Sequence, residues 1–303
     1  MILLALLVLA SQAALPQEHA IYKSVDRGAT WTKAGAFTGN PRINSFGATM
    51  DRIFAGTDAG IYSSGDRGQT WQKTSVTART VSFATSGTNI YAGTQGIGLL
   101  ASSDQGLNWI RVASLASMNI RSLLAAQGRV YAGTDSDGVM VSRDQGMTWM
   151  PHNAGLPPRS QIFAMAFVHN TIFAALYAKG LYARGENEQR WTKAGNVKPL
   201  VLAAAGAALA VGHNPGGIYW SENPNSLEWT KAAGDFESAA PVWEMASSDK
   251  LVLAGVADGI FCSLDYGRTW SRAVKGLPAK SPGVSFLIQG STIYAGLVIT
   301  SGR

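Results

Sequence analysis

Apolar and polar positions alternate along this chain in short runs that recur at regular intervals. Runs of β-prone residues such as Ile53–Thr57, Ile90–Thr94 and Val130–Thr134 are separated by glycine-rich turns. No long stretch shows the period of about 3.6 residues that marks an amphipathic helix, whereas short runs bounded by turn residues are typical of strands. The pattern predicts an all-β chain.

A tryptophan marks each recurrence of the pattern. Successive members of this series are 40, 38, 40, 42, 38 and 41 residues apart, at Trp31, Trp71, Trp109, Trp149, Trp191, Trp229 and Trp270. Self-similarity at such a period indicates a repeat architecture, and a unit of roughly 40 residues has room for the four strands of a propeller blade. Seven tryptophans therefore predict seven blades.

Five of the tryptophans close a motif of the form Ser-x-Asp-x-Gly-x-Thr-Trp, with Asn108 at the threonine position of the third copy. Serine and aspartate side chains accept backbone N–H groups in tight turns, glycine permits a positive φ, and tryptophan offers a large packing surface. A calcium loop would need further acidic ligands, so we expect a structural role and no metal. The residues that define the five copies are Ser24, Asp26, Gly28, Trp31, Ser64, Asp66, Gly68, Trp71, Ser102, Asp104, Gly106, Trp109, Ser142, Asp144, Gly146, Trp149, Ser263, Asp265, Gly267 and Trp270.

The two ends of the repeat array complement each other. Ala20–Lys23 corresponds to the third strand of a unit, whereas Val284–Ile288 and Thr292–Gly296 correspond to a first and a second strand with no motif after them. Pairing these ends closes a ring and removes exposed strand edges. The prediction is a single seven-bladed β-propeller of four-stranded blades over residues 18–303, closed by pairing of the N- and C-terminal strands.

The composition is that of a folded chain, and it leaves little room for disulfides, metal sites or cofactors. Hydrophobic residues make up 46% and charged residues 15% of the 303, and 34 glycines fit many tight turns. The formal charge of +6 suits an anionic partner, but no Lys/Arg run of the nucleic-acid-binding type occurs. Cys262 is the only cysteine, which excludes an intrachain disulfide and a cysteine-based zinc site. We expect no cofactor, no nucleic-acid partner and a monomer.

The first residues resemble an export signal. Met1–Ala10 is almost wholly aliphatic and Ser11–Ala13 offers small residues for cleavage, although no basic residue precedes the apolar run and a misassigned start codon is an alternative. The run is too short to span a membrane. Residues 1–17 are therefore predicted to be a signal peptide and leader. The mature chain would be periplasmic, lumenal or extracellular.

The repeated motif resembles the BNR/Asp-box family, and the resemblance covers nearly all of residues 20–303. The short repeats and single ring look like the photosystem II stability/assembly factor-like branch of that family. In the family the Asp box joins the third and fourth strands of a blade. The resemblance implies a non-catalytic scaffold that binds an exported or membrane protein client through an arginine-rich face.

A binding site is predicted on the face opposite the Asp boxes, where loops enter the first strand of each blade. Arginine and lysine side chains recur in these loops, and converging cations suit carboxylate or phosphate groups. The alternative is ordinary solvated charge. The basic-rim residues are Arg42, Arg79, Arg121, Arg159, Lys198 and Lys280. Four further residues are candidates for a polar pocket at the same face or in the channel: Asp135, Tyr177, His213 and Glu244.

The same family also contains glycoside hydrolases, which gives an alternative function. Sialidases carry a Phe-Arg-Ile-Pro motif, and the nearest string here, Pro41-Arg42-Ile43-Asn44, has neither the phenylalanine nor the second proline. Sialidases are six-bladed, and xyloglucanases place their cleft between two propellers. These departures favour a binding scaffold that recognises a protein or an anionic glycan over a sialidase- or xyloglucanase-like hydrolase.

Overall fold

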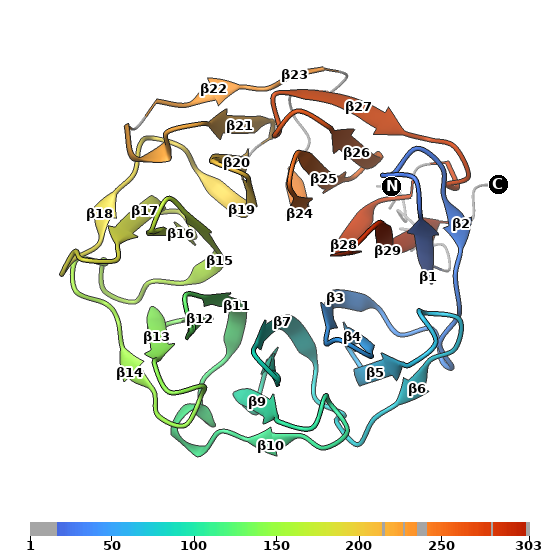
Figure 1. Cartoon of the computed structure of the whole chain (residues 1–303), viewed down its shortest axis with the longest axis horizontal. Helices are drawn as coiled ribbons and strands as arrows, with labels where there is room; N and C mark the ends of the chain where they lie inside the picture. The colour runs from blue at the N-terminus through green and yellow to red at the C-terminus, as the bar shows by residue number, and fades with distance from the viewer. Residues whose placement is uncertain (1–16, 214–215, 227, 235–240, 280, 301–303) are drawn as a thin grey trace, which may run out of the picture.

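The computed structural model describes residues 17–213, 216–226, 228–234, 241–279 and 281–300. These residues form seven antiparallel sheets arranged as blades around a central channel (Figure 1). The predicted all-β, seven-bladed propeller is confirmed. Residues 1–16 of the predicted leader lie outside the described residues, and Gln17 begins the first strand.

Each blade contributes one strand to each of four concentric positions. The inner strands of blades 1 to 7 are β3 (Ile43–Ala48), β7 (Thr80–Ser86), β11 (Ile120–Ala126), β15 (Ile162–Val168), β19 (Pro199–Ala205), β24 (Val242–Ser248) and β28 (Gly283–Gln289). The second strands are β4 (Ile53–Thr57), β8 (Asn89–Thr94), β12 (Arg129–Thr134), β16 (Thr171–Leu176), β20 (Ala208–His213), β25 (Leu251–Val256) and β29 (Thr292–Thr300).

The third strand of each blade is largely buried, whereas the outer strand is short and mostly exposed. The third strands are β5 (Gly60–Ser64), β9 (Leu99–Ser102), β13 (Val139–Ser142), β17 (Gly180–Gly185), β21 (Ile218–Ser221), β26 (Gly259–Ser263) and β1 (Gln17–Ser24). The outer strands are β6 (Gln72–Lys73), β10 (Ile110–Arg111), β14 (Met150–Pro151), β18 (Thr192–Lys193), β22 (Thr230–Lys231), β27 (Thr269–Ala273) and β2 (Thr32–Lys33). The remaining elements are β23 (Ala233–Gly234), which pairs with β27 in parallel, and two 3-10 turns, η1 (Ala113–Leu115) and η2 (Pro224–Ser226).

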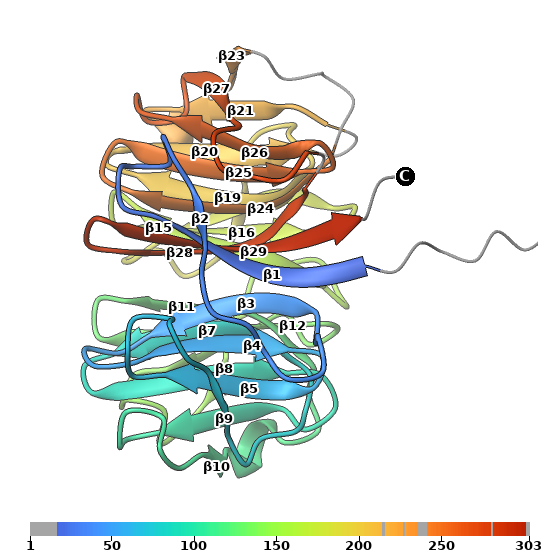
Figure 2. The same cartoon turned by 90° about the vertical axis from the view of Figure 1, so that its right-hand side faces the viewer.

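Blade 7 joins the two ends of the chain. Its sheet has the order β2-β1-β29-β28, and all eight residues of β1 pair with β29, from Gln17 opposite Thr300 to Ser24 opposite Ile293. Figure 2 shows that β1 begins and β29 ends at the same face of the ring. The predicted closure by N- and C-terminal strands is confirmed.

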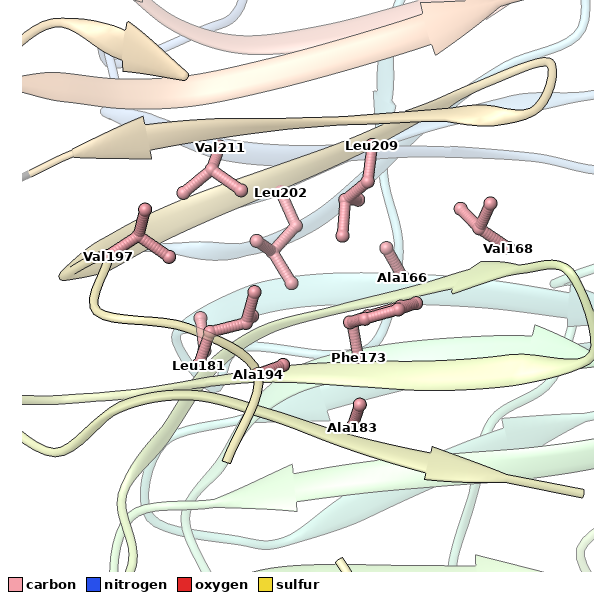
Figure 3. Close-up of a cluster of buried hydrophobic side chains, with 11 residues drawn as sticks. Ala166, Val168, Phe173, Leu181, Ala183, Ala194, Val197, Leu202, Leu209 and Val211 are labelled. Carbon is pink, nitrogen blue, oxygen red and sulfur yellow. The ribbon is translucent and has the colours of Figure 1, made fainter. Parts of the chain in front are cut away.

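The hydrophobic core is divided into seven clusters, and each cluster lies between two neighbouring blades. Between blades 4 and 5, Phe173 and Leu181 meet Leu202, Leu209 and Val211 (Figure 3). A four-stranded sheet is apolar on both sides when it packs between two others, so burial accumulates at the interfaces. The ring is therefore held together by blade-to-blade packing.

The two faces of the ring carry different connections. The box face carries the turns between third and fourth strands, where the Asp boxes lie, together with the turns between first and second strands. The entry face carries the loops into the inner strands and the turns between second and third strands. Each inner strand has a β-bulge at its second residue, near the entry face. Bulges redirect side chains, and here they do so at the mouth of the channel.

Candidate binding face and channel

The Asp boxes use their polar groups inside their own turns. In blade 1, Ser64 Oγ donates to Asp66 Oδ1 at 2.7 Å and accepts the N–H of Gly68 at 2.8 Å. Thr70 donates its N–H at 2.9 Å and its hydroxyl at 2.5 Å to the same carboxylate. The boxes of Ser24, Ser102, Ser142 and Ser263 repeat this arrangement. The geometry supports the structural role predicted for the boxes.

Hydrogen bonding to the charged form lowers the pKa of the box carboxylates. Bonds from the residue at the threonine position hold the pKa of four of them at about 2, those of Asp26, Asp66, Asp104 and Asp144. The carboxylates therefore stay ionised, and their acceptor sites are occupied by the turn itself.

Each intact box also packs against the second strand of the preceding blade. A Cβ placed on Gly106 would lie 2.3 Å from Phe54 Cζ, and one on Gly146 would lie 2.6 Å from Tyr91 Cε1. Tyr91 donates its hydroxyl to the carbonyl of Gln145 at 2.5 Å. The box glycine thus serves both a positive φ and a close blade-to-blade approach.

On the entry face, three predicted rim residues directly precede an inner strand: Arg42, Arg79 and Lys198. Arg79 Nε lies 3.0 Å from Asp58 Oδ1, and Asn44 donates to the same oxygen at 2.9 Å. The charge of Arg79 is therefore partly compensated, although both partners remain about half exposed.

Arg121 lies within β11, at its bulge, so the predicted position in an entry loop was wrong. Its Nε lies 2.5 Å from Asp135 Oδ1, and its guanidinium carbon lies 4.7 Å from the centre of the Phe163 ring. Phe163 in turn stacks on Tyr177, with ring centroids 4.9 Å apart. Gln161 donates to Asp135 at 3.2 Å. We call these five residues the blade 3–4 cluster.

The other rim residues do not join this cluster. Arg159 is exposed with φ at 49°, and its carbonyl accepts a bond of 3.0 Å from Lys179 Nζ. Within the described part of the chain, neither Arg42, Arg159 nor Lys198 forms an ion pair. Lys280 lies outside the described residues. The rim is a set of separate cations, two of which, Arg79 and Arg121, are paired with a neighbouring carboxylate.

The four residues predicted for one polar pocket fall into three places. Asp135 and Tyr177 belong to the blade 3–4 cluster. His213 lines a separate outer pocket of about 490 Å³ with Lys193, Tyr219 and others. Burial, and then the charge of Lys198, lowers the pKa of His213. Glu244 lines the central channel.

The central channel holds a cavity of about 240 Å³ lined by the inner strands. Ser45, Ser82, Ser122 and Ser285 occupy the residue after the bulge in four blades, and Glu244 occupies it in blade 6. Glu244 retains some accessible surface, yet inner strands surround it, and burial raises its pKa to about 8. Among the described lining residues it is the only carboxylate.

Blade 7 begins its inner strand with a glycine, which lies against the strand paired with Glu244. Six inner strands begin with a residue that has a side chain, whereas β28 begins with Gly283. A Cβ on Gly255, which pairs with Glu244, would lie 2.0 Å from the Gly283 carbonyl oxygen. The backbones of blades 6 and 7 are therefore in close contact at Gly255.

The sequence predicted Glu244 as a channel candidate but did not identify Phe163 as a partner of Arg121 or Trp243 as an exposed aromatic residue. Trp243, at the bulge of β24, is 44% exposed, and Tyr177 is 49% exposed. Both Phe163 and Trp243 lie at bulges, which the alternation of apolar and polar residues does not reveal.

Among the described residues, no group of three or more His, Cys, Asp and Glu side chains is placed to hold a metal ion. None of the helical turns in the described ranges has the length and apolar character needed to cross a membrane.

Comparisons with known proteins place the fold but no family. No family model matches the chain, and no curated protein matches it. YCF48 from Cyanidioschyzon merolae superposes with a TM-score of 0.67 at 15% identity, over 87% of this chain and 96% of that chain. A YCF48 bound to D1 peptide gives 0.64 at 17%, over 84% and 93%. The extracellular domain of BT4673 from B. thetaiotaomicron gives 0.70 at 14%, over 88% of this chain and 39% of that chain.

Proposed function

We propose that this chain is a non-catalytic binding scaffold that recognises a segment of a protein client on its entry face. The observation that carries the proposal is the blade 3–4 cluster, in which Arg121 is held between Asp135 and the Phe163 ring beside exposed Tyr177. Arginine and aromatic side chains held rigid at a concave rim are typical of binding surfaces.

The chemistry of the face suits a peptide with both apolar and acidic groups. Tyr177 and Trp243 offer aromatic faces on blades 4 and 6. Arg42, Arg159 and Lys198 supply cations without an ion-pair partner in the described residues, so a carboxylate can approach them. The similarity in fold to a YCF48 bound to D1 peptide supports a peptide-like ligand.

The proposal includes an exported or membrane protein as the client and a monomeric scaffold outside the cytoplasm. It rests on the signal-like first residues and on the similarity in fold to the extracellular domain of BT4673. An anionic glycan is a second ligand class for the same cations.

No observation favours the hydrolase alternative. Glycoside hydrolysis generally needs two carboxyl groups flanking the bond. Glu244 has the raised pKa of a general acid, but no second carboxylate lines the described channel. Asp135 is engaged by Arg121.

Site-specific crosslinking tests the proposal directly. A photoreactive residue is placed at Tyr177 on the entry face and, as a matched control, at Met147 on the box face, which is 83% exposed. After irradiation in envelope extract, we expect client adducts at position 177 and none at position 147. Adding Arg42→Glu should reduce the adducts, whereas Arg67→Glu on the box face should leave them unchanged.

Two results would contradict the proposal. The first is an equal adduct pattern at both positions, which would indicate nonspecific contact. The second is sustained turnover of a fluorogenic sialoside or β-glucoside that Glu244→Gln abolishes, because a scaffold needs no acid in its channel.

A further inference from the structure

The box face carries a charged pocket between blades 3 and 4. The pocket has a volume of about 280 Å³, and its walls include Arg129, Arg143, Arg184, His152, Tyr131 and Glu186. The two blades are neighbours in the ring (Figure 1). The pocket is lined by residues 184–189, in the turn that replaces an Asp box in blade 4.

The pocket lies where other residue types replace the serine, aspartate and glycine of the Asp box in blade 4. Arg184 pairs with Ile172 as the box serine Ser64 pairs with Ile53, and both stand seven residues before their tryptophan. Counting onward, Glu186 stands at the box aspartate and Glu188 at the box glycine. A short hydroxyl and a glycine have thus been replaced by side chains that reach outward.

The turn is held by different bonds and has a different backbone, because the two consecutive residues with positive φ in each intact box have no counterpart at Asn187 and Glu188. Arg184 Nε donates to the Glu188 carbonyl at 3.0 Å, and Gly185 N–H donates to Glu188 Oε2 at 3.1 Å. Trp191 donates its indole N–H to the His152 carbonyl at 2.6 Å, whereas Trp31, Trp149 and Trp270 donate to the carbonyl of their box glycine. The guanidinium of Arg184 is therefore fixed at Nε, and its two terminal nitrogens remain for another acceptor.

Three guanidiniums gather around one neutral imidazole. Burial, and then the charges of Arg184, Arg143 and Arg129, lowers the pKa of His152 to about 4. Burial also lowers the pKa of Arg184, to which Arg143 contributes. Like charges are costly to hold together unless an anion compensates them.

The carboxylates in the pocket form an ion pair with only one of these cations, and the charge of Glu188 acts on Arg184 without forming an ion pair. Glu186 Oε1 lies 3.5 Å from Arg129, and Glu188 accepts the Gly185 N–H. Across the described residues, Arg143 and Arg184 form no ion pair. His152, stacked edge-on against Trp191 at 6.0 Å, offers a neutral polar edge rather than a fourth charge.

We propose that this inter-blade pocket binds a tetrahedral oxyanion of the phosphate class, held by the unpaired Arg143 and Arg184. Guanidinium groups recognise phosphate oxygens through paired N–H donors. A tetrahedral anion carries more acceptor oxygens and more charge than a carboxylate, so it suits two guanidiniums better than a carboxylate does. The source is either the free ion or a phosphate monoester, and both present the same oxygens.

Titration calorimetry of the full chain with inorganic phosphate in low-salt buffer tests the site. Arg184→Ser restores the serine found in five boxes, and Arg143→Ser copies Ser103 of the preceding blade, so both variants suit their turns. Each should weaken phosphate binding at least about tenfold, since each removes a charged fork. Arg67→Gln is the matched control, because Gln105 and Gln145 stand at its position in other boxes, and it should change binding less than about twofold.

Further ligands sharpen the assignment. Phosphoserine binding more tightly than inorganic phosphate would assign the site to a phosphate monoester, and the reverse order would assign it to the free ion. Acetate binding as tightly as phosphate would overturn the tetrahedral assignment. Absence of saturable phosphate heat in the parent chain, or equal binding by Arg184→Ser and the parent, would overturn the site itself.

Discussion

Blades 1 and 4 connect their third and fourth strands by different turns, and the contrast separates structure from chemistry. Arg67 and Gly68 have positive φ in the blade 1 box, whereas the residues at their places in blade 4 do not. In blade 1, Asp66 accepts from Ser64 and Thr70 within the turn. In blade 4, Arg184 and Glu186 stand at the serine and aspartate positions and face a pocket. In the intact box the polar side chains form hydrogen bonds within the turn. In blade 4 the side chains at the same positions line a pocket, where a ligand can reach them.

The largest expected effect concerns the glycine of the turn. Gly106 has φ at +79°, and a Cβ there would meet Phe54, so Gly106→Ala should lower the free energy of unfolding by about 3 kcal/mol. Glu188→Ala, at the corresponding place in blade 4, removes one exposed bond to the Gly185 N–H and should lower it by only about 0.5 kcal/mol. Chemical denaturation of both variants checks the pair. Equal losses would show that the blade 4 turn is still constrained as a box.

A second departure from the repeat, Glu244 among the channel serines, gives a pH-dependent contrast. Its folded pKa of about 8 lies above the ordinary 4.5, so its neutral form is favoured on folding and stability is lost as pH rises between these values. Glu244→Gln should be as stable as the parent below pH 4.5. Near pH 8.5 it should be more stable by about 2 kcal/mol, because water in the channel reduces the full burial cost.

Denaturation curves for Glu244→Gln at several pH values measure this difference. Ser285→Gln places the same amide at the equivalent residue of blade 7, and its stability difference from the parent should not vary with pH in that range. A pH-independent difference for Glu244→Gln would contradict the raised pKa.

Rebuilding the box in blade 4 tests the contrast in the opposite direction. The combined change Arg184→Ser, Glu186→Asp, Glu188→Gly and Arg190→Thr restores the motif before Trp191. It should raise the free energy of unfolding by about 1 kcal/mol, because an intact box forms more turn bonds than the rebuilt blade loses. The losses are the Arg129–Glu186 pair and the two bonds that link Arg184 and Gly185 to Glu188. A less stable protein would show that blade 4 has adapted its packing to the rewritten turn.

The smallest effects should appear in acid, where the two kinds of turn lose stability in different ranges. The folded pKa of His152 is about 4, below its ordinary 6.5, so its contribution is complete above pH 6.5 and lost as pH falls toward 4. The pKa of Asp66 is about 2, so its contribution persists to about pH 4 and is lost toward pH 2.

Melting temperatures measured from pH 7 to pH 2 separate the two ranges. His152→Val copies Val112 of blade 2 and should flatten the decline between pH 6.5 and 4. Asp66→Asn should change only the decline below pH 4. Overlapping declines in both variants would count against the assignment.

The ring could be predicted from the sequence because a tryptophan recurs in every repeat. Tryptophan spacing marks the blades even where the box is lost, since Trp191 is still buried between blades 3 and 4. The site was harder to predict, because it depends on contacts between blades. Nothing local to Arg121 indicates that Asp135 and Phe163 will flank it, and β-bulges leave no mark in the alternation.

The change of residues in the blade 4 turn could be predicted in part from the sequence. Counting seven residues back from Trp191 gives Arg184 at a serine position, so the repeat spacing alone reveals the charge swap. Its meaning depends on Arg129 and Arg143, which come from the neighbouring blade and line the same pocket only when blades 3 and 4 pack together.

The pairing of β1 with β29 determines at which face of the ring a label or tag can be attached. Because Gln17 pairs with Thr300, both ends of the described chain leave from the entry face. A fluorescent label or an immobilising tag fused at either end will therefore stand beside the proposed client surface and report on, or obstruct, its occupancy. A circular permutant cut between β6 and β7, with Gln17 and Thr300 joined by a short linker, would also open on that face, so a box-face attachment needs new ends in a turn between β3 and β4.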